Sequence, residues 1–109
     1  MTLPEKDFKI KIGPFWYEVK YSHDIAAEGE VYGSTHSSDQ KIFIDPDRPL
    51  QKREQTFVHE VFHACNFVNG MCYRFDEKEK KPSEEEVVRA MSMVFYQVLL
   101  DNPKIFGGK

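Results

Sequence analysis

The residues with the clearest capacity for chemistry lie in one stretch, Thr56–Cys65, which contains the pattern His59-Glu60-x-x-His63. On an α-helix, His59 and His63 lie one turn apart on the same face, so both imidazoles can bind a single metal ion. Glu60 projects about 100° around the helix from His59, within reach of a water held by the metal. The remaining residues of the stretch are uncharged, which is typical of a buried helix. Burying these polar side chains is costly unless they share a metal ion, so the pattern predicts a metal site rather than a surface helix with solvated histidines.

A catalytic zinc ion usually has three protein ligands and one open position for water, and this motif supplies two of the ligands. No histidine follows His63 in the sequence, so the third ligand is either an upstream histidine, His23 or His36, or a carboxylate. The densest supply of carboxylates is Glu84–Glu86, at the predicted start of a second helix.

The three acids of this run have different expected roles. Ser83 and Glu86 have the spacing of a capping box, in which Glu86 bonds back to the amide of Ser83. On a helical wheel, Glu84 falls near the middle of the apolar stripe of the second helix, and Glu85 falls toward its edge. A metal that also meets water and substrate belongs at the border of the core, which favours Glu85, while Glu84 stays an alternative. Acids in a first helical turn also complement the helix dipole, which is the other explanation for both residues.

Two segments before the motif alternate apolar and polar residues, as strands do. Phe8–Ile12 and Phe15–Tyr21 are separated by Gly13-Pro14, so we expect them to form a hairpin. After a polar connection with room for a helical turn, Val31–His36 and Gln40–Asp45 are expected to form two more strands. The first of these contains glycine and polar residues, which is typical of an edge strand.

Two helices are expected after the strands. The motif helix should start near Asp45–Pro49, where an acidic cap and a proline favour initiation, and end at Asn69-Gly70, which provides a left-handed residue. The connection after it has room for a short strand at Cys72–Phe75. The second helix should begin at Ser83 and stop before Pro103. Its apolar residues recur with helical period and are expected to pack on the core: Val87, Val88, Met91, Val94, Phe95, Val98 and Leu99.

The chain of 109 residues has the length of one small domain, so residues 1–109 are expected to form a single α+β unit. In that unit a small antiparallel or mixed sheet of three to four strands packs against two long helices.

The net charge is −3 and no long basic run is present, which argues against nucleic-acid binding. No segment has the length of a membrane span or the character of a signal peptide, so we expect a cytoplasmic protein without a membrane partner. Cys65 and Cys72 lack the spacing of a structural zinc site.

The motif and the second helix together resemble a known family. A His-Glu-x-x-His motif followed by a glutamate on a later helix is the arrangement of gluzincin-type metallopeptidases. Ile42–Asp45 before the motif, and Thr56 three residues before His59, resemble the short ImmA/IrrE-like metallopeptidases and the compact zincin-like proteins common in phages and prophages. The second helix fits the pattern of that group with Glu85, Val88, Met91 and Ser92. The chain departs from larger members at Arg89, which occupies a position that often holds an asparagine.

This resemblance implies a zinc metallopeptidase of minimal zincin-like fold, a hydrolase whose Zn²⁺ is bound by His59, His63 and Glu85. Glu60 would act as the general base on a metal-activated water, and the substrate would be a peptide or a protein.

An extended substrate would then lie along the expected edge strand at Ser34–His36, pairing main chain to main chain. His36 and Tyr32 are candidates to stabilise the oxyanion that forms during hydrolysis. The alternative is a protein that binds metal without catalysis, as an accessory or structural component of a phage or prophage.

Overall fold

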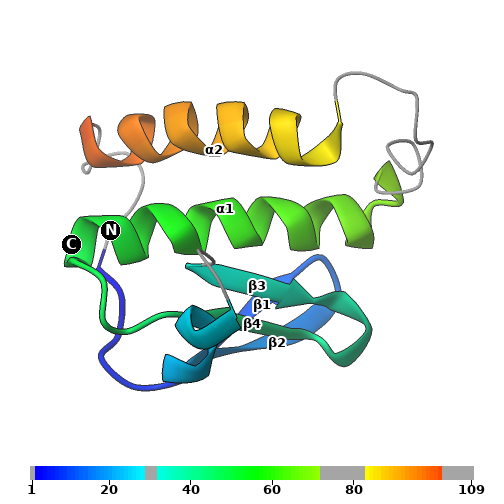
Figure 1. Cartoon of the computed structure of the whole chain (residues 1–109). Coiled ribbons are helices and arrows are strands. Elements are labelled where there is room, and N and C mark those ends of the chain that lie inside the picture. The colour runs from blue at the N-terminus through cyan, green and yellow to red at the C-terminus, as the bar shows by residue number, and fades with distance from the viewer. Residues whose placement is uncertain (1, 29–31, 72–82, 102–109) are drawn as a thin grey trace.

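The structure, a computed structural model, describes residues 2–28, 32–71 and 83–101 of the chain. It has three layers: a four-stranded sheet, helix α1 (Leu50–Val68) packed on one face of the sheet, and helix α2 (Glu84–Asp101) packed on the other side of α1 (Figure 1). The strands are β1 (Phe8–Ile12), β2 (Phe15–Tyr21), β3 (Gly33–His36) and β4 (Lys41–Ile44), with two short 3-10 helices, η1 (His23–Glu28) and η2 (Ser37–Asp39). The predicted α+β class, with a mixed sheet and two long helices, is confirmed. Within the described ranges, neither helix is both long and apolar enough to cross a membrane.

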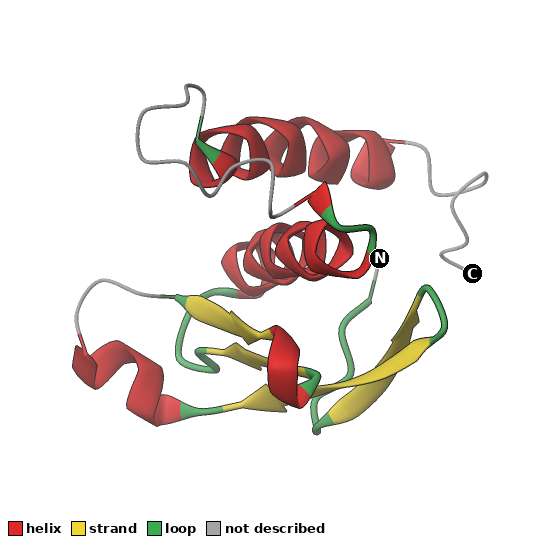
Figure 2. Ribbon diagram, turned by 90° about the vertical axis from the view of Figure 1, so that its right-hand side faces the viewer, coloured by secondary structure: helices red, strands yellow, loops and turns green. Residues whose placement is uncertain are grey.

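The sheet has the strand order β1-β2-β4-β3 (Figure 2). Strands β2 and β4 are parallel, and the two outer pairs are antiparallel. The predicted hairpin is confirmed with the predicted bounds, and its register pairs Phe8 with Val19 and Ile12 with Phe15. The prediction that the third strand lies at an edge is also confirmed, since β3 pairs only with β4 among the described strands. The helical turn expected in the polar connection is η1.

The core lies between the sheet and α1, and it fixes the orientation of α1. Alternate residues of the two central strands point toward the helix, and each is at most 1% exposed: Tyr17, Val19, Ile42 and Ile44. Ala64 of α1 is fully buried among them. Full burial of a large apolar side chain contributes about 1.5–3 kcal/mol, so these four residues hold α1 firmly on the sheet. Phe15 alternates with Tyr17 and Val19 along β2 but is 47% exposed, because it begins the strand at the hairpin turn.

The start of α1 differs from the predicted acidic cap. The N-cap residue is Pro49, whose side chain has no hydrogen-bond acceptor. Asp45, which is 1% exposed, accepts hydrogen bonds from the amide of Asp47 (2.9 Å) and from Nε of Arg48 (3.1 Å). The acid therefore closes the turn between β4 and α1 instead of capping the helix. At the other end, Gly70 has a φ of +81°, so the predicted left-handed residue after the helix is confirmed.

Helix α2 starts where predicted, but only part of its predicted apolar stripe is buried. The Oγ of Ser83 accepts a hydrogen bond from the amide of Glu86 at 3.2 Å, which is the N-cap half of the predicted capping box.

Val88 and Ser92 of α2 are at most 1% exposed, whereas Met91 and Phe95, which were expected in the core, are 55% and 41% exposed. The prediction selected core residues by their apolar character. Ser92 is buried although it is polar, because a small side chain lets two helices approach closely. The side chains of Val94 and Val98, and the strand expected at Cys72–Phe75, lie outside the described residues.

A polar contact joins the two helices about two turns of α1 before the middle of the His-Glu-x-x-His motif. The hydroxyl of Tyr96 donates a hydrogen bond to Oε1 of Glu54 at 3.2 Å, and Glu54 is only 5% exposed. Burial, together with the charge and hydrogen bond of Glu54, raises the pKa of Tyr96 to about 12. The phenol is therefore a hydrogen-bond donor at neutral pH, and it satisfies a carboxylate oxygen that has left water.

We expect Tyr96→Phe to lower the free energy of unfolding by about 1–3 kcal/mol, because the Glu54 carboxylate stays buried without this donor. Urea denaturation followed by circular dichroism measures the loss. The matched control is the double variant Glu54→Met/Tyr96→Phe, in which both polar groups are gone. Its loss should be smaller than the sum of the two single losses, and additive losses would show that the two side chains do not interact.

Candidate metal centre

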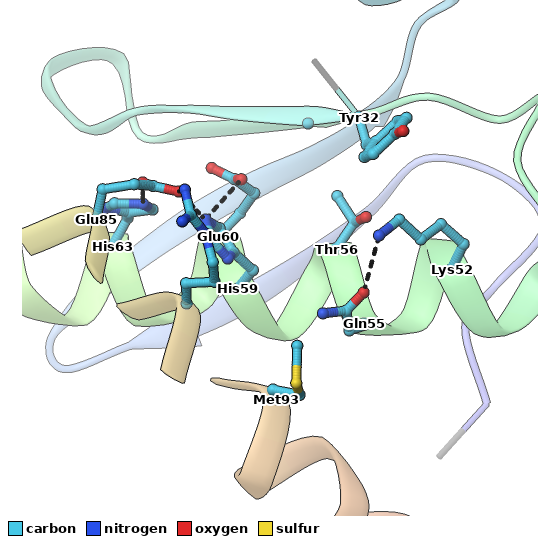
Figure 3. Close-up of a pocket in the computed structure, with 11 residues that line it drawn as sticks. Tyr32, Lys52, Gln55, Thr56, His59, Glu60, His63, Glu85 and Met93 are labelled. Atoms are coloured by element: carbon cyan, nitrogen blue, oxygen red, sulfur yellow. Dashed lines mark hydrogen bonds and ion pairs between the residues drawn. The ribbon is translucent and has the colours of Figure 1, made fainter. Parts of the chain in front are cut away.

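The motif of α1 faces a cavity of about 520 Å³. Helix α1 forms its floor, Tyr32 and Gly33 at the start of β3 form one wall, and the first turns of α2 form the other. His59, Glu60 and His63 project from α1 into the same region, and Glu85 reaches that region from α2 (Figure 3). The predicted site residues are thus brought together from two helices that are separated in the sequence.

Glu85 bridges the two histidines of the motif. Its Oε1 lies 3.1 Å from Nε2 of His59, and its Oε2 lies 2.9 Å from Nε2 of His63. One donor atom from each of the three residues lies within 4.8 Å of the other two, close enough to bind one metal ion. Donors of a tetrahedral zinc site are about 3.3 Å apart when each is about 2.0–2.1 Å from the metal, so small side-chain rotations suffice to enclose the ion.

Glu84, the alternative ligand, binds the other side of His63. Its Oε1 lies 2.7 Å from Nδ1 of His63, and a carboxylate can only accept there, so Nδ1–H is the donor. By the same rule Nε2–H donates to Oε2 of Glu85 at 2.9 Å, and once that proton is lost the lone pair of the neutral imidazole is on Nε2, which faces the candidate metal position. Glu84 therefore orients a candidate ligand, in the way that carboxylates beside metal-bound histidines commonly do. The sequence placed Glu84 beside the site without indicating this role.

The two flanking acids also change the proton affinity of His63. Burial disfavours the imidazolium, but the hydrogen bond that His63 donates to Glu84 and the charges of Glu60 and Glu85 outweigh it, so the pKa of His63 lies above its ordinary value. A metal ion that binds Nε2 must displace the proton there.

Glu60 is held by the edge strand, through a residue that the sequence analysis did not single out. The hydroxyl of Thr35 donates to Oε1 of Glu60 at 2.6 Å, and it also lies 3.1 Å from the main-chain oxygen of Glu60. Burial raises the pKa of the Glu60 carboxyl, while the Thr35 hydrogen bond and the two imidazoles lower it by less. The other oxygen, Oε2, lies 3.9 Å from Nε2 of His59. The period-two alternation of a strand puts Thr35 on the same face as Gly33, which was the available signal for its role.

Gly33 lets β3 approach α1 closely enough for this contact. A Cβ at this position would lie 2.6 Å from Cγ2 of Thr56 and 2.9 Å from the main-chain oxygen of Phe43. Both distances are shorter than any van der Waals contact, so no larger residue fits without moving the strand.

The other histidines are not part of the site. His36 lies on the opposite face of β3 from Thr35, with its Nε2 3.2 Å from Oγ of Ser34 and its ring edge-on to Phe43. The side chain of His23 is 73% exposed and pairs with Asp47 at 2.8 Å.

Of the two oxyanion candidates, His36 and Tyr32, only Tyr32 lines the cavity.

Arg89 lies near the candidate metal site. Its guanidinium nitrogen Nη2 lies 3.7 Å from Oε1 of Glu85, one turn earlier on α2. Both side chains are half-exposed or more, so this ion pair is weak. It still places a positive charge beside the acid.

The three adjacent acids of α2 provide a graded test of the site. We expect Glu85→Ala to lose zinc binding, because it removes a ligand, and Glu84→Ala to weaken binding by about 10–100-fold, because it frees the ring of His63. Glu86→Ala is the matched control, since Glu86 is exposed in the same helical turn and makes no contact with the two histidines in the described structure. Competition with a chromophoric zinc chelator measures all three affinities. Loss of binding in Glu84→Ala, with binding kept in Glu85→Ala, would reverse the assignment of the two residues.

Comparison with known proteins gives no relative for this chain: no protein-family model, no curated protein and no solved structure matches it. What the site does must therefore be argued from its own geometry.

Proposed function

We propose that the protein is a zinc-dependent metallopeptidase in which His59, His63 and Glu85 bind Zn²⁺ and Glu60 is the general base. The observation that carries this proposal is the convergence of three donor atoms within 4.8 Å of one another, beside an acid that is only 7% exposed. Two imidazoles and one carboxylate are a donor set that suits zinc and leaves a coordination position for water. A structural zinc site would have four protein ligands, whereas the group found among the described residues has three.

Glu60 has the environment that a general base needs. A zinc ion in the site would supply Lewis acidity, polarising the scissile carbonyl and lowering the pKa of a water. Glu60 takes a proton from that water as the oxygen attacks the carbonyl carbon, and it gives the proton to the amine as the C–N bond breaks. Burial raises the pKa of its carboxyl and so strengthens it as a base. Because Thr35 binds Oε1, Oε2 is the oxygen that is left for the proton.

The outer edge of β3, with which no other described strand pairs, supports a peptide as the substrate. The amide of Asp45 donates to the carbonyl of Tyr32, so these residues form a hydrogen-bonded pair next to the β3–β4 ladder. Hydrogen-bonded pairs alternate in an antiparallel ladder, so the main-chain groups of Gly33 and Thr35 point away from β4. An extended peptide can add to this edge as a further strand, and Gly33 also lines the cavity that contains the donor atoms.

We expect Glu60→Gln to keep zinc and to lose peptide hydrolysis by at least about 10²-fold in kcat, because the amide cannot accept the proton. The assay is digestion of a mixed peptide library by zinc-loaded protein, read by mass spectrometry, with bound zinc measured by elemental analysis. The paired control, His63→Ala, should lose both zinc and hydrolysis. Equal digestion by the unchanged protein and Glu60→Gln would contradict the proposal and favour a protein that binds metal without catalysis.

A further inference from the structure

The cavity extends well beyond the three donor atoms, along one face of α1. Lys52, Thr56, His59 and His63 follow one another on that face at intervals of three or four residues, and all four line the cavity. Lys52 is seven residues before His59, which corresponds to about 10 Å along the helix axis. The side chain of Lys52 lies along the helix, with its amine directed toward Gln55 and thus toward the motif (Figure 3).

The two ends of the cavity have opposite charge. Carboxylates of Glu60 and Glu85 lie at the end with the histidines, and the ammonium of Lys52 lies at the other end. Lys52 is half-buried, its amine donates a hydrogen bond to Oε1 of Gln55 at 3.1 Å, and it lies 4.7 Å from the ring centroid of Tyr32. Among the residues that the structure describes, no carboxylate lies within ion-pair distance of this ammonium.

The neighbouring cations differ from Lys52 in this respect. Arg48 also lies over the ring of Tyr32, at 4.4 Å, but its guanidinium is paired with the buried carboxylate of Asp45. Arg89, on the opposite wall of the cavity, lies 3.7 Å from Glu85. Of these three cations in the described structure, Lys52 is the one whose charge contacts only a neutral amide and an aromatic ring, both of which leave room for an anionic partner.

We propose that Lys52 binds a carboxylate of the peptide substrate, so that the protein prefers peptides with an acidic group two or three residues from the bond it cleaves. This inference rests on the proposed peptidase function. An extended peptide advances about 3.3–3.6 Å per residue, so the separation of about 10 Å between Lys52 and His59, shortened by the reach of the lysine side chain, spans two to three residues. A carboxylate there gains a charge-assisted hydrogen bond in a partly desolvated site.

The carboxylate has two sources, an acidic side chain and the C-terminus of the peptide, and synthetic substrates separate them. A peptide that the zinc-loaded protein cleaves is prepared with glutamate or glutamine at the second and third positions from the cleaved bond, and with a free or amidated C-terminus. We expect kcat/KM to fall about tenfold or more when the bound carboxylate is neutralised, which is the size of a hydrogen bond to a charged group. A fall on glutamine substitution identifies the side chain, and a fall on amidation identifies the terminus.

Variants of Lys52 connect this preference to the proposed contact. Lys52→Met keeps the apolar stem that packs against Tyr32, and it should bring the ratio of kcat/KM for the acidic and neutral peptides close to one. Lys52→Glu should invert the preference toward peptides with lysine or arginine at the same position. Lys9→Met, on β1 at the far edge of the sheet from the cavity, is the matched control and should keep the original preference. Thermal unfolding of each variant confirms that it is folded.

The outcomes separate this inference from the function it rests on. Cleavage that depends on Glu60, with an acid preference that persists in Lys52→Glu or with no acid preference at all, overturns the role of Lys52 alone. Absence of any Glu60-dependent cleavage overturns the peptidase proposal, and the role of Lys52 falls with it.

Discussion

Ionisable side chains withdrawn from water need partners, and in this protein that requirement joins all three layers. His59, Glu60 and His63 lie in the middle of α1, between a sheet and a second helix, where an unpaired charge would cost several kcal/mol or more. The sheet supplies Thr35 to Glu60, and α2 supplies Glu84 and Glu85 to the histidines. The sheet therefore supplies a hydrogen-bond partner for Glu60, and α2 supplies the partners of His59 and His63. The close approach of β3 at Gly33 and the burial of Ser92 on α2 are the packing features that bring these partners within hydrogen-bond distance.

Much of the fold could be predicted because its strands are regular. Phe8–Ile12 and Phe15–Tyr21 alternate strictly, and both have the predicted bounds. The sequence prediction was wrong at places where a polar side chain had more than one possible hydrogen-bond partner. An acid within Asp45–Pro49 was expected to cap α1, but Pro49 is the N-cap residue and Asp45 binds Asp47 and Arg48 within the turn, because its carboxylate is buried one turn too early to reach the helix. On α2 the burial of Val88 was predicted correctly, but that of Met91 and Phe95 was not, since hydropathy favours Met91 over Ser92 and carries no information on how closely two helices pack.

The candidate site, like the fold, could be predicted from the sequence only in part. The spacing of His59, Glu60 and His63 is local to one helix, so the sequence alone shows that the three side chains are neighbours. The structure brings Glu85 to both histidines, as the family resemblance implied, but Thr35 and the orienting role of Glu84 depend on distances between layers that no one-dimensional pattern contains. The assignment of zinc and of peptide hydrolysis stays a proposal that rests on this donor set and on the outer edge of β3.

The position of Glu85 on α2 links metal supply to the cohesion of the molecule. Two ligands come from α1 and the third from α2, so an ion bound by all three would act as a cross-link between the helices. Helix α2 contacts α1 over its buried face and has several large apolar side chains facing solvent on its other face, so no further layer holds it in place among the described residues. A ligand that binds only the folded state adds about 2.7 kcal/mol of stability at a free concentration of 100 times its dissociation constant. Scarcity of the ion would therefore loosen the outer helix and expose the chain to degradation, so its lifetime in a cell would depend on the available metal.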